Sequence, residues 1–110
     1  MTSSRPISLQ ELASAIPNLA DEIKEFATAR DWVQYHTPRN LILALLGEVG
    51  ELAELVQWEG DEKPLDFETK VSLDKLSQEL ADVSIYLLRL ATVTDTVAAL
   101  QEAISQPQNM

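Results

Sequence analysis

Apolar residues recur at helical spacing over most of the chain, with polar residues between them. In the middle of the chain this stripe consists of Leu41, Leu45, Leu52 and Leu55. A threonine before a proline, as in Thr37-Pro38, is typical of a helix N-cap and first turn, and Gly60 suits a helix C-terminus. The pattern therefore predicts a helix from about Pro38 to Trp58.

A second long stripe follows a charged segment over residues 59–66. Its apolar positions are Leu73, Leu76, Leu80, Val83, Leu87 and Leu90. Their spacing predicts a helix that begins at about Asp66 or Phe67 and ends at Thr92. Because such stripes pack best when neighbouring helices run in opposite directions over short loops, we expect the two long helices to be antiparallel.

The N-terminal third of the chain contains a shorter helical pattern with a proline inside it. Ser8 and Glu11 have the spacing of a capping box, which predicts a helix from there to Ile16. Pro17 then leaves two alternatives: one kinked helix, or a second helix that begins near the proline and runs towards Trp32.

Thr94 and Asp95 are candidate caps for a last short helix that ends at Ser105. Clusters of β-branched and aromatic residues are absent, and the chain has 3 glycines in 110 residues. We therefore expect an all-α fold, an antiparallel bundle of three to five helices in one domain over residues 1–110. Stripes this long in so small a domain favour assembly as a homo-oligomer.

The charge of the chain limits its partners. With 8 basic and 18 acidic residues the net charge is −10, so we expect no nucleic acid polymer as a partner. The longest apolar run, LILALLG, stops at Glu48, so neither a secretory signal nor a membrane span is expected. The absence of cysteine is consistent with a reducing compartment, and we expect a cytoplasmic protein with no membrane partner.

Four acidic residues interrupt the apolar stripes. Glu48 lies on the stripe of the central helix with Glu51 one turn later, and Glu79 and Asp82 repeat this spacing along the next stripe. If the two helices pack antiparallel, the four carboxylates converge. Hard oxygen ligands at this density suit Mg²⁺ or Mn²⁺, often with substrate phosphates as further ligands. The alternative is that all four acids lie on solvated helix faces.

Aromatic side chains accompany these acids. Trp58 follows Glu51 by seven residues and Tyr86 follows Glu79 by seven, so each aromatic residue shares the edge of an acidic helix face. Aromatic faces beside a metal site suit the stacking of a nucleobase. The alternative is that these rings, and Trp32, fill the core.

The single histidine, His36, precedes Arg39 and Asn40. These residues have the chemistry to contact a phosphate or a base, although His36 is equally suited to capping the next helix. One histidine and no cysteine make a zinc site unlikely to form, and no Gly-rich phosphate loop or hydrolase nucleophile motif occurs. Any chemistry on phosphates would depend on the carboxylates and a metal ion.

Two segments carry a resemblance to a known family. RDWVQYHTPRNLILALLGEVGELAELVQW and the downstream QELADVSIYLLRLA resemble the MazG-like all-α nucleoside triphosphate pyrophosphohydrolases, most of all the dCTP pyrophosphatase branch. The resemblance covers about residues 22–92, within a MazG-like domain whose core we expect at about 18–105. It implies an enzyme, a hydrolase that converts a dNTP, dCTP or a modified dCTP, to dNMP and pyrophosphate in nucleotide-pool house-cleaning.

The resemblance also implies roles for individual residues. Mg²⁺, with Mn²⁺ as a substitute, would be held by Glu48, Glu51, Glu79 and Asp82, and Glu48 or Glu51 would activate the attacking water. Substrate binding would fall to Trp32, His36, Arg39, Asn40, Trp58 and Tyr86. The family forms homodimers or homotetramers in which more than one subunit lines the pocket.

Two departures from the near relatives bear on specificity. They carry a pocket histidine nine residues before the tryptophan of RDW, where this chain has Ile23. They also end in a basic segment without an equivalent here, so phosphate contacts would come from Arg39, Lys63 or Lys70. The alternative function is therefore a catalytically weak or inactive helical oligomerisation or nucleotide-binding module.

Overall fold

The computed structural model describes residues 8–58 and 73–106. In these residues it contains five α-helices, one short 3₁₀ helix and no strand, which confirms the all-α prediction. The elements are α1 (Leu9–Ala13), α2 (Ile16–Ala29), η1 (Val33–Tyr35), α3 (Pro38–Glu54), α4 (Leu73–Val93) and α5 (Val97–Ser105).

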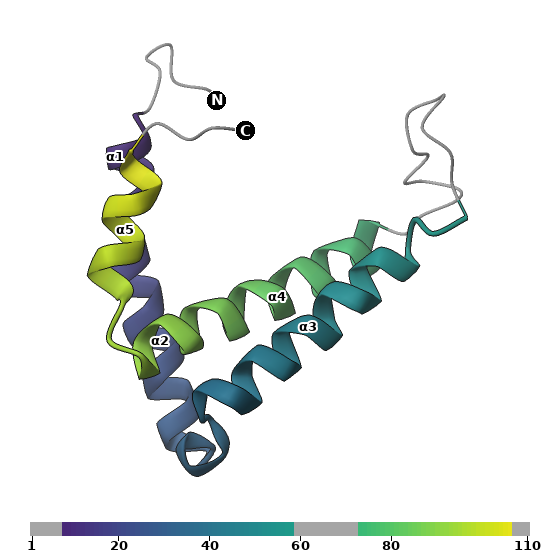
Figure 1. Ribbon diagram of the computed structural model, residues 1–110, viewed down its shortest axis with the longest axis horizontal. Helices are drawn as coiled ribbons and strands as arrows, with labels where there is room; N and C mark the ends of the chain where they lie inside the picture. Colours follow the sequence, from purple (N-terminus) through teal and green to yellow (C-terminus); the bar gives the residue numbers. More distant parts are fainter. Residues whose placement is uncertain (1–7, 59–72, 107–110) are drawn as a thin grey trace.

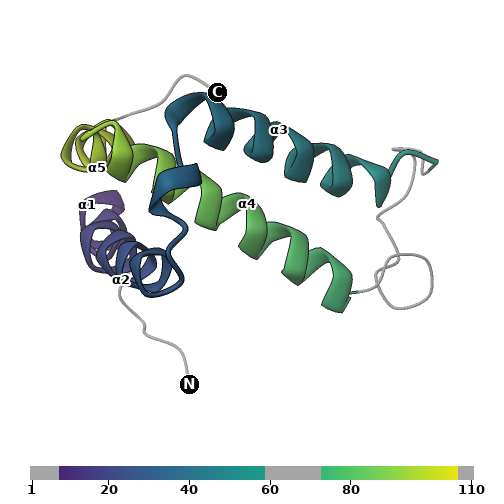
Figure 2. The same ribbon diagram turned by 90° about the horizontal axis from the view of Figure 1, so that it is seen from below.

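The helices form two arms that meet at an angle rather than one closed bundle (Figure 1). The long helices α3 and α4 lie side by side and antiparallel in one arm, while α1, α2 and α5 form the other. Figure 2 shows the same division from below, with α4 reaching across to the end of α2. The predicted antiparallel pairing is therefore observed, but a single chain leaves the bundle open.

The helix starts follow the local sequence signals. The Glu11 N–H donates to Ser8 Oγ at 3.0 Å and the Ser8 N–H donates to Glu11 Oε1 at 3.3 Å, so the predicted capping box is formed. Pro17 lies in the first turn of α2. Of the two predicted alternatives, the structure therefore has a second helix that begins near the proline, and not one kinked helix. Thr37 Oγ1 accepts the Asn40 N–H at 3.1 Å, as predicted for the N-cap of α3.

The predicted end of the central helix was wrong. Helix α3 ends at Glu54 rather than at Trp58, and residues 55–58 form a turn. Leu55 and Val56 donate their N–H groups three residues back, to Leu52 and Ala53 at 3.2 and 3.1 Å, and this tighter bonding closes the last turn. Gly60, the expected C-terminal glycine, lies outside the described residues, as does the expected start of the next helix at Asp66 or Phe67.

The connection between α4 and α5 also differs from the prediction. Asp95 adopts the left-handed region with φ 56° and reverses the chain, so it does not cap a helix. Thr94 Oγ1 instead bonds back to the Leu90 carbonyl oxygen at 2.7 Å. The residue before α5 is Thr96, whose side chain makes no capping hydrogen bond.

The core of a single copy is small and consists mostly of alanine. Among the side chains that the structure describes, the buried apolar residues are Ala13, Ala20, Ala27, Leu41, Leu88 and Ala91. Leu41, at 1 % exposed, is the one large side chain among them that is fully buried. The buried alanines lie in α1, α2 and α4, and so small a side chain removes little apolar area from water.

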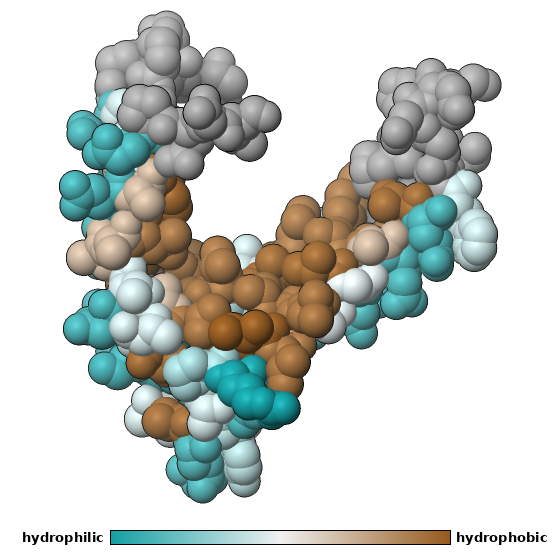
Figure 3. Space-filling model, viewed as in Figure 1, coloured by the Kyte–Doolittle hydropathy of each residue, from teal (hydrophilic) through white to brown (hydrophobic). Residues whose placement is uncertain are grey.

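Much of the predicted apolar stripe remains uncovered in one copy. Leu73, Leu80 and Leu87 recur every seven residues on α4 and are 42 to 55 % exposed. Figure 3 shows apolar side chains gathered on the inner side of the two arms.

A test for membrane-spanning segments adds one observation. In the described parts of the chain, no single helix is long and apolar enough to cross a membrane. Only α4 and α5 taken as a pair meet the criteria of length and composition, and they are bent by 119° relative to one another.

Candidate active site

Three of the predicted acidic residues meet between the two long helices. Glu48 and Glu51 come from α3, and Glu79 comes from the first half of α4. One carboxylate oxygen of each lies within 4.8 Å of the other two. The i,i+3 spacing places Glu48 and Glu51 on the side of α3 that faces α4, so the antiparallel packing brings the third acid to them.

Burial makes this arrangement costly without a cation. Glu79 is 3 % exposed, and its Oε1 accepts a hydrogen bond from Lys75 Nζ at 3.0 Å. The Oε2 atoms of Glu48 and Glu79 are buried and have no hydrogen-bond partner. Buried carboxylate oxygens without a partner are rare, because the lost hydration is not replaced.

The electrostatics of the cluster set Glu48 apart from Glu79. Desolvation raises the pKa of Glu48 to about 7, and the carboxyl groups of Glu51, Asp82 and Glu79 add to this effect. The hydrogen bond from Lys75 lowers the pKa of Glu79, although its burial acts in the opposite direction. Below about pH 7 the cluster therefore favours a proton on Glu48, while the lowered pKa of Glu79 favours its ionised form.

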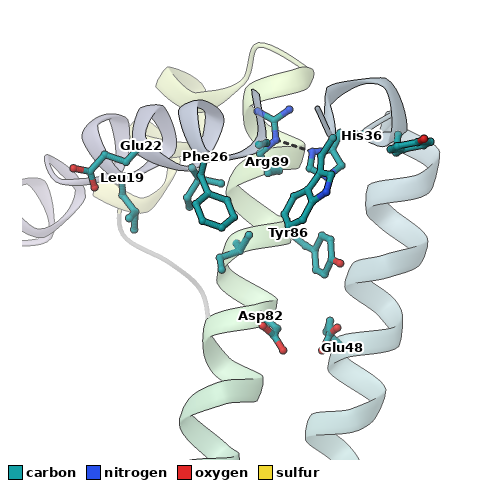
Figure 4. Close-up of a pocket in the computed structure, with 13 residues that line it drawn as sticks. Leu19, Glu22, Phe26, His36, Glu48, Asp82, Tyr86 and Arg89 are labelled. Atoms are coloured by element: carbon teal, nitrogen blue, oxygen red, sulfur yellow. Dashed lines mark hydrogen bonds between the residues drawn. The ribbon is translucent and has the colours of Figure 1, made fainter. Parts of the chain in front are cut away.

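These residues fit a divalent metal ion. The ligand atoms are hard carboxylate oxygens from two helices, and two of them are buried without a partner. A cation would satisfy both and would oppose the desolvation and the carboxylate repulsion that raise the pKa of Glu48. Asp82 lies outside this set of three, but it faces Glu48 from α4 (Figure 4).

A cavity of about 730 Å³ opens between α2 and the pair formed by α3 and α4. Its lining residues are Leu19, Glu22, Ile23, Phe26, Ala27, Trp32, Tyr35, His36, Glu48, Asp82, Ile85, Tyr86 and Arg89. Figure 4 shows Glu48 and Asp82 at one end and His36 with Arg89 at the other. A mostly apolar cavity with a few polar groups at its ends is typical of a small-molecule site.

Helix α4 supplies one wall of this cavity from a single face. Asp82, Ile85, Tyr86 and Arg89 follow the spacing i, i+3, i+4 and i+7. Seven residues of helix separate the two charged positions by about 10 Å along the axis. The acidic end and the basic end of the cavity therefore lie two turns apart, with Tyr86 between them.

Aromatic rings line the opposite wall. The Phe26 and Trp32 rings meet edge to face with centroids 5.7 Å apart, and Trp32 lies 6.3 Å from the His36 ring. The Arg30 guanidinium stacks over Phe26 at 3.3 Å from the ring centroid. Asp31, in the left-handed region with φ 58°, turns the chain out of α2 and directs Trp32 back to the cavity.

The structure places the predicted site residues in three groups. Trp32, His36 and Tyr86 line the cavity together with Glu48 and Asp82. Glu51 and Glu79 lie in the acid cluster but do not line the cavity. Three predicted substrate-binding residues lie in neither place: Arg39 and Asn40 are in the first turn of α3, and Trp58 is 87 % exposed in the turn after α3. The Asn40 side-chain amide donates to the Tyr35 carbonyl oxygen at 3.1 Å, so in this chain it ties η1 to α3.

Sequence analysis missed Arg89 and Phe26 as cavity residues. Arg89 lies seven residues after Asp82 in the same apolar stripe, and a basic residue on that stripe is as unusual as the acids were. The same criterion that singled out Glu48 would have found Arg89.

Comparisons with known proteins agree on one family. Residues 36–106 match the family described as the MazG nucleotide pyrophosphohydrolase domain. The dCTP pyrophosphatase 1 of Bos taurus is 48 % identical over 94 residues, which cover 82 % of this chain and 53 % of that protein. The dCTP pyrophosphatase 1 of Homo sapiens is 55 % identical over 69 residues, covering 61 % and 40 %.

A solved structure extends the likeness to the fold. The crystal structure of a pyrophosphatase from Archaeoglobus fulgidus superimposes with a TM-score of 0.64 and 30 % identity. This match covers 94 % of the present chain and 92 % of that chain. The present chain spans about half, or less, of the length of the curated relatives it matches.

Proposed function

The chain belongs to the MazG nucleotide pyrophosphohydrolase family, and we propose that it converts a deoxynucleoside triphosphate to the monophosphate and pyrophosphate. The proposed substrate is dCTP or a modified dCTP, because both dCTP pyrophosphatase 1 sequences are about half identical to this chain over the matched residues. The corresponding cellular role is nucleotide-pool house-cleaning.

One observation carries this proposal: the partly buried acid cluster, with Glu79 buried and Glu51 exposed, opens onto an aromatic cavity. Glu48 belongs to both, since it lies in the cluster and lines the cavity. A ligand with an anionic end and a flat ring fits this polarity, with a cation between its phosphates and the carboxylates. A nucleoside triphosphate has this combination of charge and shape.

The proposed cation is Mg²⁺, with Mn²⁺ as a substitute, held by Glu48, Glu51, Glu79 and Asp82. When bound, it supplies charge neutralisation on the phosphoryl oxygens. Glu48 or Glu51 would accept the proton of the attacking water through its carboxylate. Lys75 keeps Glu79 ionised as a ligand.

The aromatic end of the cavity is the proposed base site. Trp32 and Tyr86 offer ring faces, and His36 offers a polar edge beside Trp32. Ile23 also lines the cavity, with an alkyl side chain. Arg39, Asn40 and Trp58 lie outside the cavity of one copy, so their proposed contacts with substrate require a different part of the ligand or a second subunit.

The test of substrate class is pyrophosphate release from a panel of dNTPs and NTPs with Mg²⁺. We expect the highest kcat/KM with dCTP or a 5-modified dCTP. If another base is preferred, the proposed reaction stands, and Ile23 becomes the candidate residue for the altered base preference. Tight binding of a nucleotide without release of pyrophosphate from any substrate would contradict the proposed enzymatic activity. It would favour the alternative, a catalytically inactive nucleotide-binding module.

We further propose that the protein is a homodimer or homotetramer. The support is the uncovered apolar surface: Ile42, Leu46 and Val49 form a stripe on α3 that is 43 to 66 % exposed in one copy. Exposed apolar patches of this kind mark interaction surfaces. A two-fold assembly would cover the same stripe on each copy and close the open bundle.

The raised pKa of Glu48 predicts how pH changes stability in the absence of divalent cations. Between its ordinary value of 4.5 and about 7, the folded protein keeps a proton that the unfolded chain has lost. The contribution of Glu48 to stability therefore falls as the pH rises through this window. The pKa of Glu79 is lowered from its ordinary value of 4.5. The contribution of Glu79 to the stability of the folded protein is therefore present above that value and is lost as the pH falls below it.

Millimolar Mg²⁺ is therefore expected to raise the melting temperature more at about pH 8 than at about pH 5.5, because at low pH it must displace the proton on Glu48. Thermal unfolding of the wild type and of Glu48→Gln, with and without Mg²⁺, measures this. The substitution should remove most of the pH dependence of the Mg²⁺ effect. An equal pH dependence in both proteins would contradict the assignment to Glu48.

A further inference from the structure

A buried arginine at the aromatic end of the cavity holds the histidine by an unusual contact. Arg89 is 2 % exposed, and its Nε donates a hydrogen bond to His36 Nδ1 at 3.0 Å (Figure 4). The two residues are 53 positions apart, so the contact joins α4 to the segment between η1 and α3. No acidic residue in the described ranges forms an ion pair with Arg89.

The chemistry of the pair fixes the protonation of the imidazole. An arginine in a protein stays protonated and has no acceptor atom, so Nδ1 of His36 must supply the lone pair. The hydrogen of the neutral imidazole then lies on Nε2. Burial, and secondly the charge of Arg89, lower the pKa of His36, so the doubly protonated form is disfavoured as well.

We propose that Arg89 is a positioning residue that holds His36 in the tautomer with its hydrogen on Nε2, so that His36 acts as a specificity-determining hydrogen-bond donor to the base of the bound nucleotide. In the described residues, no protein group accepts a hydrogen bond from this nitrogen. His36 lines the cavity beside Trp32, so its N–H is available to a ligand that stacks there.

The charges around the pair support a role in recognition. The other charged groups that line the cavity are Glu22 from α2, Glu48 from α3 and Asp82 from α4, and Figure 4 shows Glu48 and Asp82 at the opposite end from His36. A buried cation that faces a neutral imidazole instead of a carboxylate is not a favourable packing element by itself. The Arg89 cation has a role in recognition if it keeps the hydrogen of the His36 imidazole on Nε2, where it can be donated to a ligand.

This inference rests on the proposed function and deepens it, because it identifies the kind of atom on the base that His36 recognises, a hydrogen-bond acceptor. A fixed N–H donor selects a base with an acceptor atom at the edge that meets it, such as the ring carbonyl of a pyrimidine. A site that donates a hydrogen bond discriminates strongly against a ligand that lacks the acceptor, since the donor is then left unpaired. Arg89 would act through His36 without touching the substrate.

The test uses the fact that the chain has a single histidine. A two-dimensional ¹H–¹⁵N spectrum of the imidazole, recorded on the intact protein, distinguishes a protonated ring nitrogen from an unprotonated one. We expect the hydrogen on Nε2 in the wild type. In Arg89→Met, which removes the donor and keeps a side chain of similar length, we expect a mixture of tautomers and a higher pKa of His36. Arg89→Lys should restore the wild-type pattern in part.

Kinetics on the same proteins separate this role from a structural one. Arg89→Met should lower kcat/KM for the preferred nucleotide about tenfold, mainly through KM, which is the loss expected for one misdirected hydrogen bond. In a His36→Phe background the same substitution should have little further effect, because residues that act through one another are not additive.

Each outcome bears on one claim. A hydrogen on Nδ1 in the wild type, or fully additive effects of the two substitutions, would overturn the inference even if the enzyme is active. An Nε2–H tautomer that is lost in Arg89→Met, in a protein that neither binds nor hydrolyses a nucleotide, would overturn the proposed function and with it the role of His36 in base recognition.

Discussion

Replacing Glu48 by glutamine is expected to lower kcat for pyrophosphate release by at least about 10³-fold, the scale at which single groups that stabilise a transition state act. Glu48 is the one residue that lies both in the acid cluster and in the cavity lining. Glutamine keeps the shape of the side chain but removes the negative charge and the proton acceptor. Steady-state assays of the purified variant at saturating Mg²⁺ measure the loss.

The matched control is Glu54→Gln, which makes the same change six residues later on α3, at an exposed position outside the cluster. It should keep nearly full activity. The Glu48 variant should also remain folded, because it removes the carboxyl group whose pKa is raised by desolvation and by the neighbouring carboxyl groups. Activity within a factor of about ten of the wild type in Glu48→Gln would contradict the catalytic role of the cluster.

Placing a charge on the uncovered stripe of α3 is expected to have the largest effect on assembly. Leu46 is 66 % exposed, so Leu46→Glu should be well tolerated within one copy. In a two-fold assembly across this stripe, the same substitution would bury an unpaired carboxylate on each subunit, at a cost of several kcal/mol. We expect the dissociation constant of the oligomer to rise by at least about 10³-fold.

Light scattering coupled to size-exclusion chromatography measures this directly over a range of protein concentrations. Asn18→Glu, at an exposed position in the first turn of α2, adds the same charge away from the stripe and should leave the oligomer intact. A wild-type protein that is monomeric at all concentrations would contradict the proposed assembly. An oligomer that survives Leu46→Glu would place the interface on another face.

The sequence was most informative where a local signal determines a local structure. Ser8 with Glu11, Pro17 and Thr37 set the starts of three helices, because capping chemistry involves residues only a few positions apart. Glu48 and Glu79 stood out because acids on an apolar stripe conflict with burial, and both are part of the observed cluster.

The interpretation was weaker where the outcome depends on distant residues. The arrangement of the helices in two arms follows from contacts between α2, α4 and α5, which periodicity along one helix does not report. The contact of Arg89 with His36 joins residues 53 positions apart and was missed for the same reason. The extent of the domain, with a core at about 18–105, stays a prediction, since the family match covers 36–106.

Hydrolysis of dCTP in water enriched in ¹⁸O, with Mg²⁺ present, tests the central claim most directly. The proposed reaction breaks the bond between the α-phosphorus and the bridging oxygen, so the label should appear in dCMP and not in pyrophosphate. Mass spectrometry of the two products gives the answer. Label in the pyrophosphate, formation of dCDP with inorganic phosphate, or no hydrolysis of any triphosphate would contradict the assignment of this site as a nucleotide pyrophosphohydrolase.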